Sequence, residues 1–183
     1  SKQQKMGARD LHVGMVKKQW HIAAGPVGKQ TTMQSSVLED DNIRVQTLDR
    51  RIQEDALTVS WKANEAAQFG LFSPFPDDLL GYQEANASLQ FDYKLLSASA
   101  GDLTIQVHCM DKCENSVDIA NELTQKDEWR TFSISLRCFT QQGVNFNKIM
   151  SPFILTASQP VSLAISDIKL VPDSGENADI TCQ

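Results

Sequence analysis

The feature that most constrains the fold of this chain is the recurrence of apolar residues at every second position. A period of two is typical of a β-strand with one buried face, whereas an amphipathic helix repeats every 3.6 residues. No helical stripe persists for more than about eight residues. The alternating runs are residues 43–48, 57–62, 89–95, 103–109, 132–138 and 161–170. The sequence therefore predicts an all-β fold.

Turn-forming residues separate the alternating runs. Gly, Pro, Asn, Asp and Ser gather at 73–78, 99–102 and 172–175, where they favour tight turns. Short strands separated in this way, each with one apolar and one polar face, are typical of two antiparallel sheets that pack against each other. We therefore expect a β-sandwich.

Two local irregularities are also predicted. In the last run the apolar phase slips by one residue after Ile165, which indicates a β-bulge at residues 166–167. Short helical turns are expected at 118–123 and around 141–149.

The charge of the chain is unevenly distributed. Residues 1–30 hold six basic residues and one acidic residue, and the remainder holds 11 basic and 22 acidic residues, a net charge of −11. A basic lead is either a linker to another domain or an arm that binds nucleic acid, and the lack of aromatic residues before Trp20 favours the linker. We expect a basic lead or interdomain linker over 1–30, a β-sandwich domain over 31–172 and a C-terminal tail over 173–183.

The acidic charge and the short apolar runs exclude two classes of partner. A nucleic-acid-binding surface needs a basic stripe, which an acidic body does not supply. No apolar run approaches the roughly 20 residues that a membrane-spanning helix needs. We therefore expect neither nucleic acid nor membrane as a partner.

The four cysteines bear on the cellular compartment. Cys109 and Cys113 are close enough in sequence to form a disulfide across a tight turn, worth about 2 kcal/mol. A zinc site would need two further ligands, and His108 points to the opposite face of a strand from Cys109. This favours the disulfide, and with it the periplasm or the exterior of the cell. Cys138 is interpreted as a small buried apolar residue, and no pairing is predicted for Cys182.

Motifs of catalysis are missing from the sequence. The glycine-containing stretch 25–31 lacks the spacing of a phosphate-binding loop, and neither His-Glu-x-x-His nor Gly-x-Ser-x-Gly occurs,. Adjacent acid pairs, such as Asp77 and Asp78, would face opposite ways on a strand, which suits the two carboxylates of a glycosidase poorly. We expect no catalytic residue in this chain.

A sugar-binding site would place a flat aromatic ring beside planar polar groups. The candidates for such a site are Trp20, Phe72, Phe75, Tyr82, Gln83 and Asn86. Phe75 and Tyr82 also suit contacts with a neighbouring domain, and Trp61 is interpreted as a core residue because it ends an alternating strand. Asn86 begins an Asn-Ala-Ser glycosylation sequon.

A structural calcium ion is the one cofactor that the sequence suggests. Calcium prefers carboxylate and carbonyl oxygens. Asp167 at the expected bulge, together with Glu39, Asp40 or Asp41, would supply such ligands. No loop has the regular spacing of an EF-hand.

Five segments together resemble a known family. They are 55–61, the Cys109 to Cys113 loop, the Trp129 to Phe139 segment, 152–156, and 163–170 with its Asp-Ile-Lys-Leu end. Their order and content are similar to the C-terminal domain of ExoP-type exo-β-glucanases and β-glucosidases of glycoside hydrolase family three. The resemblance covers roughly residues 40–172.

The resemblance implies a galactose-binding-like jelly roll that follows a catalytic barrel and a second α/β domain. In that family the nucleophile and the acid/base belong to the preceding domains, so none is expected here. The resemblance also fits a disulfide between Cys109 and Cys113.

Two functions fit these observations. The first is a noncatalytic module of a larger periplasmic or secreted enzyme, which binds β-glucan or gluco-oligosaccharide and adjoins upstream catalytic domains. The alternative is a structural domain that packs on those domains without binding sugar. The alternative predicts an exposed apolar patch containing some of Phe69, Leu71, Phe72, Phe75, Leu79 and Leu80,.

Overall fold

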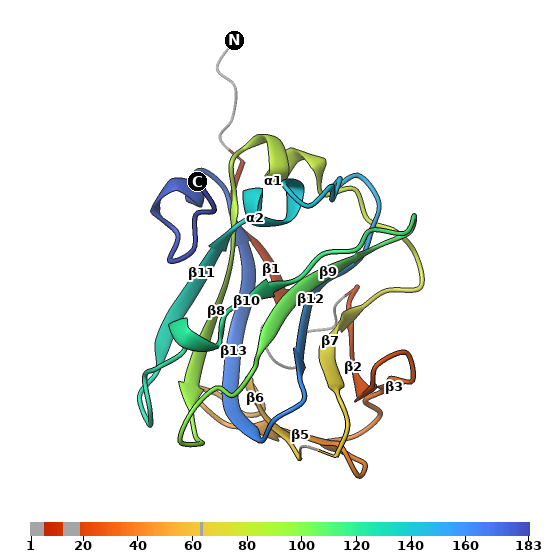
Figure 1. Ribbon diagram of the computed structural model, residues 1–183, viewed down its shortest axis with the longest axis vertical. Coiled ribbons are helices and arrows are strands. Elements are labelled where there is room, and N and C mark those ends of the chain that lie inside the picture. The colour runs from red at the N-terminus through yellow and green to blue at the C-terminus, as the bar shows by residue number, and fades with distance from the viewer. Residues whose placement is uncertain (1–5, 13–18, 63) are drawn as a thin grey trace.

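Two β-sheets stack face to face in the computed structural model, which describes residues 6–12, 19–62 and 64–183 (Figure 1). Every pairing between the named strands is antiparallel. Short helices cover one end of the sandwich, at the top of Figure 1. The all-β, galactose-binding-like sandwich predicted from the sequence is confirmed.

Sheet A contains the strands that the period of two predicts most clearly. Its order is β11 (Arg130–Ser135), β8 (Ser88–Leu95), β13 (Val161–Val171), β6 (Ala56–Trp61), β5 (Ile43–Leu48) and β4 (Val37–Glu39). A further strand, β1 (Arg9–His12), pairs with β13 beyond the point where β6 ends.

In sheet B, the alternation predicted the strand at 104–109 but none of the other described strands. Its order is β10 (Val117–Asp118), β9 (Thr104–Cys109), β12 (Ile149–Ala157), β7 (Ala67–Phe72), β2 (His21–Pro26) and β3 (Thr31–Thr32). Strands β7 and β12 are buried along most of both faces, so they lack the polar residue at every second position. The short β2 lies within the segment expected to be a linker.

The helices are short. They are α1 (Leu80–Glu84), α2 (Arg137–Thr140) and the 3₁₀ turns η1 (Ala120–Glu122) and η2 (Gly175–Asn177). The turn expected at 118–123 is confirmed as η1, whereas the turn expected around 141–149 is wrong, since α2 ends before it. Among the described helices, none is long and apolar enough to cross a membrane.

Phenylalanine rings hold the two sheets together. Phe69 and Phe153 of sheet B meet edge to face, with centroids 6.2 Å apart, and Phe153 meets Phe91 of sheet A at 5.2 Å. Phe91 in turn contacts Phe132 at 5.5 Å. Trp61 is 3% exposed, and its indole nitrogen donates to the backbone oxygen of Ala67 at 3.0 Å, so its assignment to the core is confirmed.

The predicted β-bulge lies where the slip in phase placed it. The register between β13 and β8 shifts between Ser166 and Lys169. Asp167 has a φ of 53°, in the left-handed region, which Asp adopts more readily than most residues,.

The two ends of the chain differ from the expected lead and tail. Strands β1 and β2 lie within 1–30, and Arg9 forms an ion pair with Asp77. The described part of the expected linker is therefore built into both sheets, while residues 1–5 and 13–18 lie outside the described residues. At the other end, the backbone of Ser135 donates to Ile180 at 2.9 Å. The sandwich therefore extends beyond 31–172 in both directions.

All four cysteines form disulfides. The predicted bond between Cys109 and Cys113 is present. The interpretation of Cys138 as a simple buried apolar residue is wrong, because Cys138, although 2% exposed, is bonded to Cys182. The partner lies 44 residues away in sequence, so local spacing gives no sign of the pair.

We expect the two disulfides to contribute unequally to stability. Replacing both Cys138 and Cys182 by alanine lowers the free energy of unfolding by about 4 kcal/mol, because a long loop in the unfolded chain is released. Replacing Cys109 and Cys113 costs about 2 kcal/mol, since that loop is short. Urea denaturation of both double variants measures the difference. An equal decrease in the free energy of unfolding for both double variants would contradict the expectation that the longer loop matters more.

Candidate functional site

The outer face of sheet B carries an aromatic ring together with planar polar side chains. Along β7, alternation turns Phe69 and Leu71 inward, where neither is exposed,. The residues between them and their cross-strand neighbours turn outward. This surface, called the sheet B face below, presents His21, Gln68, Phe72, Gln106, His108 and Thr156.

The register of four strands sets the shape of the sheet B face. Phe72 lies opposite His21, while Gly70 lies between Ala23 on one side and Ile154 on the other. His21 and His108 are exposed, whereas Gly70 and Ala23 are buried. Gly70 and Ala23 therefore place two small residues side by side on this face.

Gly70 has a specific role on this face. A Cβ atom at this position would lie 2.6 Å from the backbone oxygen of Phe153 and 3.0 Å from Cε2 of Phe72. The lack of a side chain at Gly70 therefore lets the Phe72 ring pack down against the sheet. Phe72 is half-buried, so part of its ring stays open to solvent as an apolar surface.

Planar polar groups lie on the same face. Gln68 is 7% exposed, and its amide donates to the hydroxyl of Thr156 at 3.3 Å and accepts from the amide of Gln30. These contacts fix the orientation of the Gln68 amide. A face that combines a half-buried ring with a fixed amide and exposed imidazoles offers a pyranose its ring for the C–H face and its polar groups for the hydroxyls.

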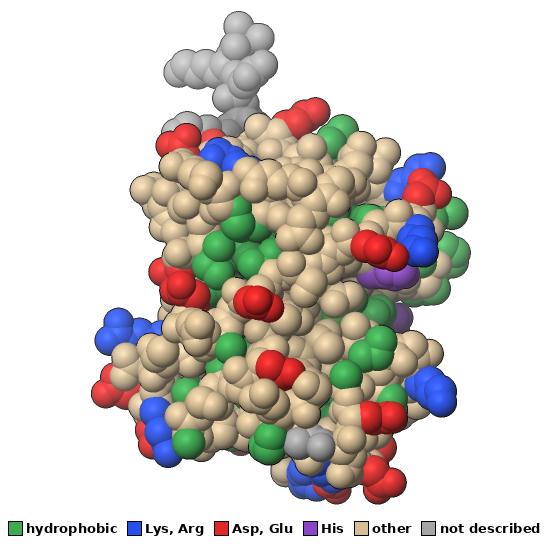
Figure 2. All heavy atoms as spheres, viewed as in Figure 1, with side chains coloured by type: hydrophobic (Ala, Val, Ile, Leu, Met, Phe, Trp, Pro, Cys, Tyr) green, Lys and Arg blue, Asp and Glu red, His purple; other side chains and the backbone are tan. Residues whose placement is uncertain are grey.

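Two exposed apolar residues stand at the end of sheet B. Phe75 is 73% exposed and Met110 is 59% exposed. The backbone of Ser73 donates to Met150 and that of Met110 to Lys148, so the two loops flank the start of β12. In Figure 2, hydrophobic side chains and histidines lie close together at the right-hand edge of the molecule. Charged side chains lie among them, so this edge is a mixed apolar and charged rim beside the sheet B face.

The structure separates the predicted sugar-binding residues. Phe72 lies on the sheet B face and Phe75 on its rim. Trp20 is 5% exposed and belongs to the core, so its prediction as a surface platform is wrong. Trp20 directly precedes β2, a strand of the sandwich, and its indole therefore packs in the core.

The remaining candidates lie at the end of the sandwich that the helices cover. Tyr82 on α1 packs against the core. Gln83 accepts a hydrogen bond from the backbone of Phe146 at 3.0 Å. Gln83 and Asn86 line a hollow of about 340 Å³ with Arg137. The structure therefore brings these two polar residues together near Tyr82 of α1, apart from Phe72 on the sheet B face.

The glycosylation sequon is poorly presented. Ser88, its third residue, is fully buried, and its hydroxyl lies 2.5 Å from that of Ser174. Asn86 has a φ of 51° and points its amide oxygen toward Gly175. The sequon serves as a turn at the start of β8.

The apolar patch expected of a purely structural domain is largely internal. Phe69, Leu71 and Leu79 are fully buried in this domain's own core. Phe75 is strongly exposed, whereas Phe72 and Leu80 are half-buried.

The proposed calcium ligands do not converge. Glu39 pairs with Lys62 and Arg44, whereas Asp167 pairs with Arg50 and Arg51. Glu39 lies across β5 from the Ser60 end of β6, and Asp167 follows the residue paired with Ala56, so about 14 Å of strand separates the two positions. Asp41 lies in the turn next to Glu39. Among the described residues, no group of three or more His, Cys, Asp or Glu side chains is placed to hold a metal.

The carboxylate of Asp167 instead joins a network around Arg50. The Arg50 guanidinium donates to Asp92 at 2.7 Å and to Asp167 at 3.3 Å. Its central carbon lies 4.0 Å from the centre of the Trp129 ring, and the Lys94 amine lies 5.3 Å from the same ring. Two cations therefore lie over Trp129, which makes this ring a structural element of sheet A.

Sequence reasoning missed most of the polar residues of the sheet B face. His21 was placed in a linker, and Gln68 and Gln106 had no recognisable motif. His108 was correctly expected to point away from Cys109: it is exposed, whereas Cys109 is 6% exposed. The signal that finds these residues is the pairing of β2, β7, β12 and β9, which local alternation does not contain.

Comparison with known proteins agrees with this architecture. The sequence profile of the Exop_C family, described as galactose-binding domain-like, matches residues 18–170. No curated protein sequence matches the chain.

Three solved structures share the fold. The extra C-terminal domain of the exo-1,3/1,4-β-glucanase ExoP from a Pseudoalteromonas species has a TM-score of 0.68 at 19% identity, over 89% of this chain and 91% of that one. The longer ExoP structure has a TM-score of 0.71 at 19% identity, over 93% of this chain but 21% of that one. A family 30 carbohydrate-binding module of a Clostridium thermocellum cellulase has a TM-score of 0.62 at 17% identity, over 88% and 97%.

We expect the Asp92 carboxylate to stabilise the protein in a pH-dependent way. Burial tends to raise the pKa of Asp92, but hydrogen bonds from Thr131 and Arg50 outweigh it and lower the pKa below its usual 3.8. The stabilisation is therefore complete above about pH 4 and disappears as the pH falls through the lowered pKa. Asp92→Asn should lower the free energy of unfolding by about 1–2 kcal/mol at pH 7 and by much less near pH 2.

Urea denaturation at both pH values measures this effect, and Asp41→Asn, at an exposed turn, is the control. If Asp92→Asn lowered the free energy of unfolding equally at both pH values, the charge of Asp92 would not be what stabilises the network.

Proposed function

Because the chain belongs to the Exop_C family of galactose-binding-like domains, we propose that it is a noncatalytic, carbohydrate-binding accessory domain of a β-glucan-degrading enzyme. The observation that carries this proposal is the sheet B face, where the Phe72 ring packs over Gly70 beside the fixed amide of Gln68. The ring supplies an apolar platform, and the amides and imidazoles supply hydrogen bonds to hydroxyl groups.

The ligand of this site is a β-glucan or a gluco-oligosaccharide. The similar structures support this choice, since one is named as a domain of an exo-1,3/1,4-β-glucanase and another as a carbohydrate-binding module of a cellulase. A net charge of −6 suits a neutral polymer better than an acidic one,. One ring and a few hydrogen bonds give dissociation constants on the order of 10 μM to 1 mM.

The catalytic residues belong to other domains of the same polypeptide. The fold covers 21% of the longer ExoP structure, which leaves room in that protein for separate catalytic domains. In this proposal the accessory domain holds the substrate near those domains. The two disulfides support a periplasmic or secreted location, because such bonds persist in oxidising compartments,.

Substitution of the aromatic platform tests the proposal. Phe72→Ala should weaken binding of the 183-residue chain to laminarin and cello-oligosaccharides by about tenfold, or ~1.4 kcal/mol, because the apolar contact with the sugar is lost. Isothermal titration calorimetry measures the affinity. Ile52→Ala is a matched control, since Ile52 is 67% exposed in a turn that joins two strands of sheet A.

Two results would contradict the proposal. The first is an unaltered wild-type chain that shows no heat with either glucan at millimolar concentration. The second is equal affinity for the wild type and Phe72→Ala, with thermal melting confirming that both proteins are folded.

A further inference from the structure

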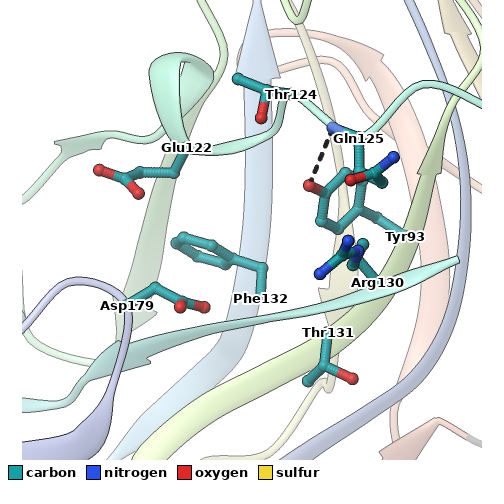
Figure 3. Close-up of a pocket in the computed structure, with 8 residues that line it drawn as sticks. All are labelled: Tyr93, Glu122, Thr124, Gln125, Arg130, Thr131, Phe132 and Asp179. Carbon is teal, nitrogen blue, oxygen red and sulfur yellow. Dashed lines mark hydrogen bonds between the residues drawn. The ribbon is translucent and has the colours of Figure 1, made fainter. Parts of the chain in front are cut away.

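A hollow distinct from the one at Gln83 and Asn86, called the edge hollow below, lies at the edge of the sandwich beside the edge strand β11 (Figure 3). Its volume is about 200 Å³, below the 300–1,000 Å³ of sites for drug-sized ligands,. It is lined by Tyr93, Glu122, Thr124, Gln125, Arg130, Thr131, Phe132 and Asp179. None of these residues belongs to the sheet B face.

Charges of both signs flank this edge hollow. In Figure 3 the Arg130 guanidinium lies on one side of the Phe132 ring, and Glu122 and Asp179 lie on the other. Phe132 is 1% exposed, so it forms a closed floor and offers little surface for stacking. Within the described part of the chain, neither Arg130 nor Glu122 forms an ion pair. Their hydrogen-bonding groups are therefore available to a ligand.

Part of the wall of the edge hollow is held in place by hydrogen bonds. Oδ2 of Asp179 accepts a hydrogen bond from the backbone of Ser133 at 2.8 Å, and Ser133 Oγ accepts one from the backbone of Asp179 at 3.0 Å. The Tyr93 hydroxyl accepts from the backbone of Gln125 at 3.3 Å. The nearby bond between Cys138 and Cys182 ties the C-terminal segment to the sandwich. Asp179 is therefore already held in position, which lowers the entropy that this side chain loses when a ligand binds.

The arrangement of charge selects a class of ligand. A lone cation would be repelled by the guanidinium, and a lone anion would be repelled by two carboxylates. An uncharged ligand that both donates and accepts hydrogen bonds can satisfy all three groups without this repulsion. Sugar hydroxyls donate to carboxylates and accept from a guanidinium, and hydrogen bonds to charged groups are the stronger ones. The small volume limits the ligand to about one ring.

We infer that the edge hollow is a second saccharide site, which binds one terminal glucose unit of a glucan by hydrogen bonds to Arg130, Glu122 and Asp179. The choice of glucose rests on the proposed function, whereas the site itself does not use Phe72. A chain end held here and a chain segment held on the sheet B face would give the domain two points of attachment to one polysaccharide.

Nuclear magnetic resonance of the ¹⁵N-labelled 183-residue chain tests this inference with D-glucose and cellobiose as probes. Both sugars should shift the amide signals of Gln125, Thr131 and Phe132. Arg130→Ala should weaken this response by roughly tenfold, because a charge-assisted hydrogen bond is lost. Arg51→Ala, which removes an exposed arginine elsewhere on sheet A, should leave it unchanged.

The Phe72→Ala variant separates the two sites. If it retains the glucose response of the edge hollow, the second site is independent of the first, and this holds even if laminarin binding by the sheet B face fails. The inference would be overturned if the amide signals of Gln125, Thr131 and Phe132 did not shift at a high concentration of glucose. It would also be overturned by an equal response from the wild type and Arg130→Ala, with thermal melting confirming that both are folded.

Discussion

The contact of four phenylalanine rings between the sheets is the interaction on which the rest of the structure depends. Phe69 and Phe153 come from sheet B, Phe91 and Phe132 come from sheet A, and the rings meet in a continuous series. None is more than 1% exposed, so burial of these rings supplies a large part of the hydrophobic stabilisation. Because the packed rings fill the space between the inner faces, a ligand can bind only at the outer faces or the edges of the sheets.

The predictability of each strand follows from how many of its faces are buried. Strand β8 alternates cleanly, since its outward residues Gln90, Asp92 and Lys94 are partly exposed. Strand β12 does not, because Pro152 and Ile154 on its outer side are as buried as Phe153. The period of two therefore identifies the longer strands of sheet A, though not the short β1 and β4, and fails in the middle of sheet B, which is where the candidate site lies.

The candidate site was harder to predict than the fold, because its members come together only through pairing of distant segments. Phe72 was identified from its chemistry, but His21, which lies opposite it, is 51 positions away in sequence. Trp20 had suitable chemistry and the wrong environment, since the strand that follows it enters the core. Residue type thus suggests candidates, and register decides which of them share a surface.

The C-terminal segment has a consequence for solubility. An edge strand exposes unpaired backbone groups that can pair with another molecule. In this protein the segment around Ile180 covers part of the outer edge of β11 through backbone hydrogen bonds with Ser133 and Ser135. The bond between Cys138 and Cys182 keeps it there. Reduction of that bond would therefore uncover a strand edge and favour aggregation. The disulfide thus prevents association between molecules in addition to stabilising the fold of each one.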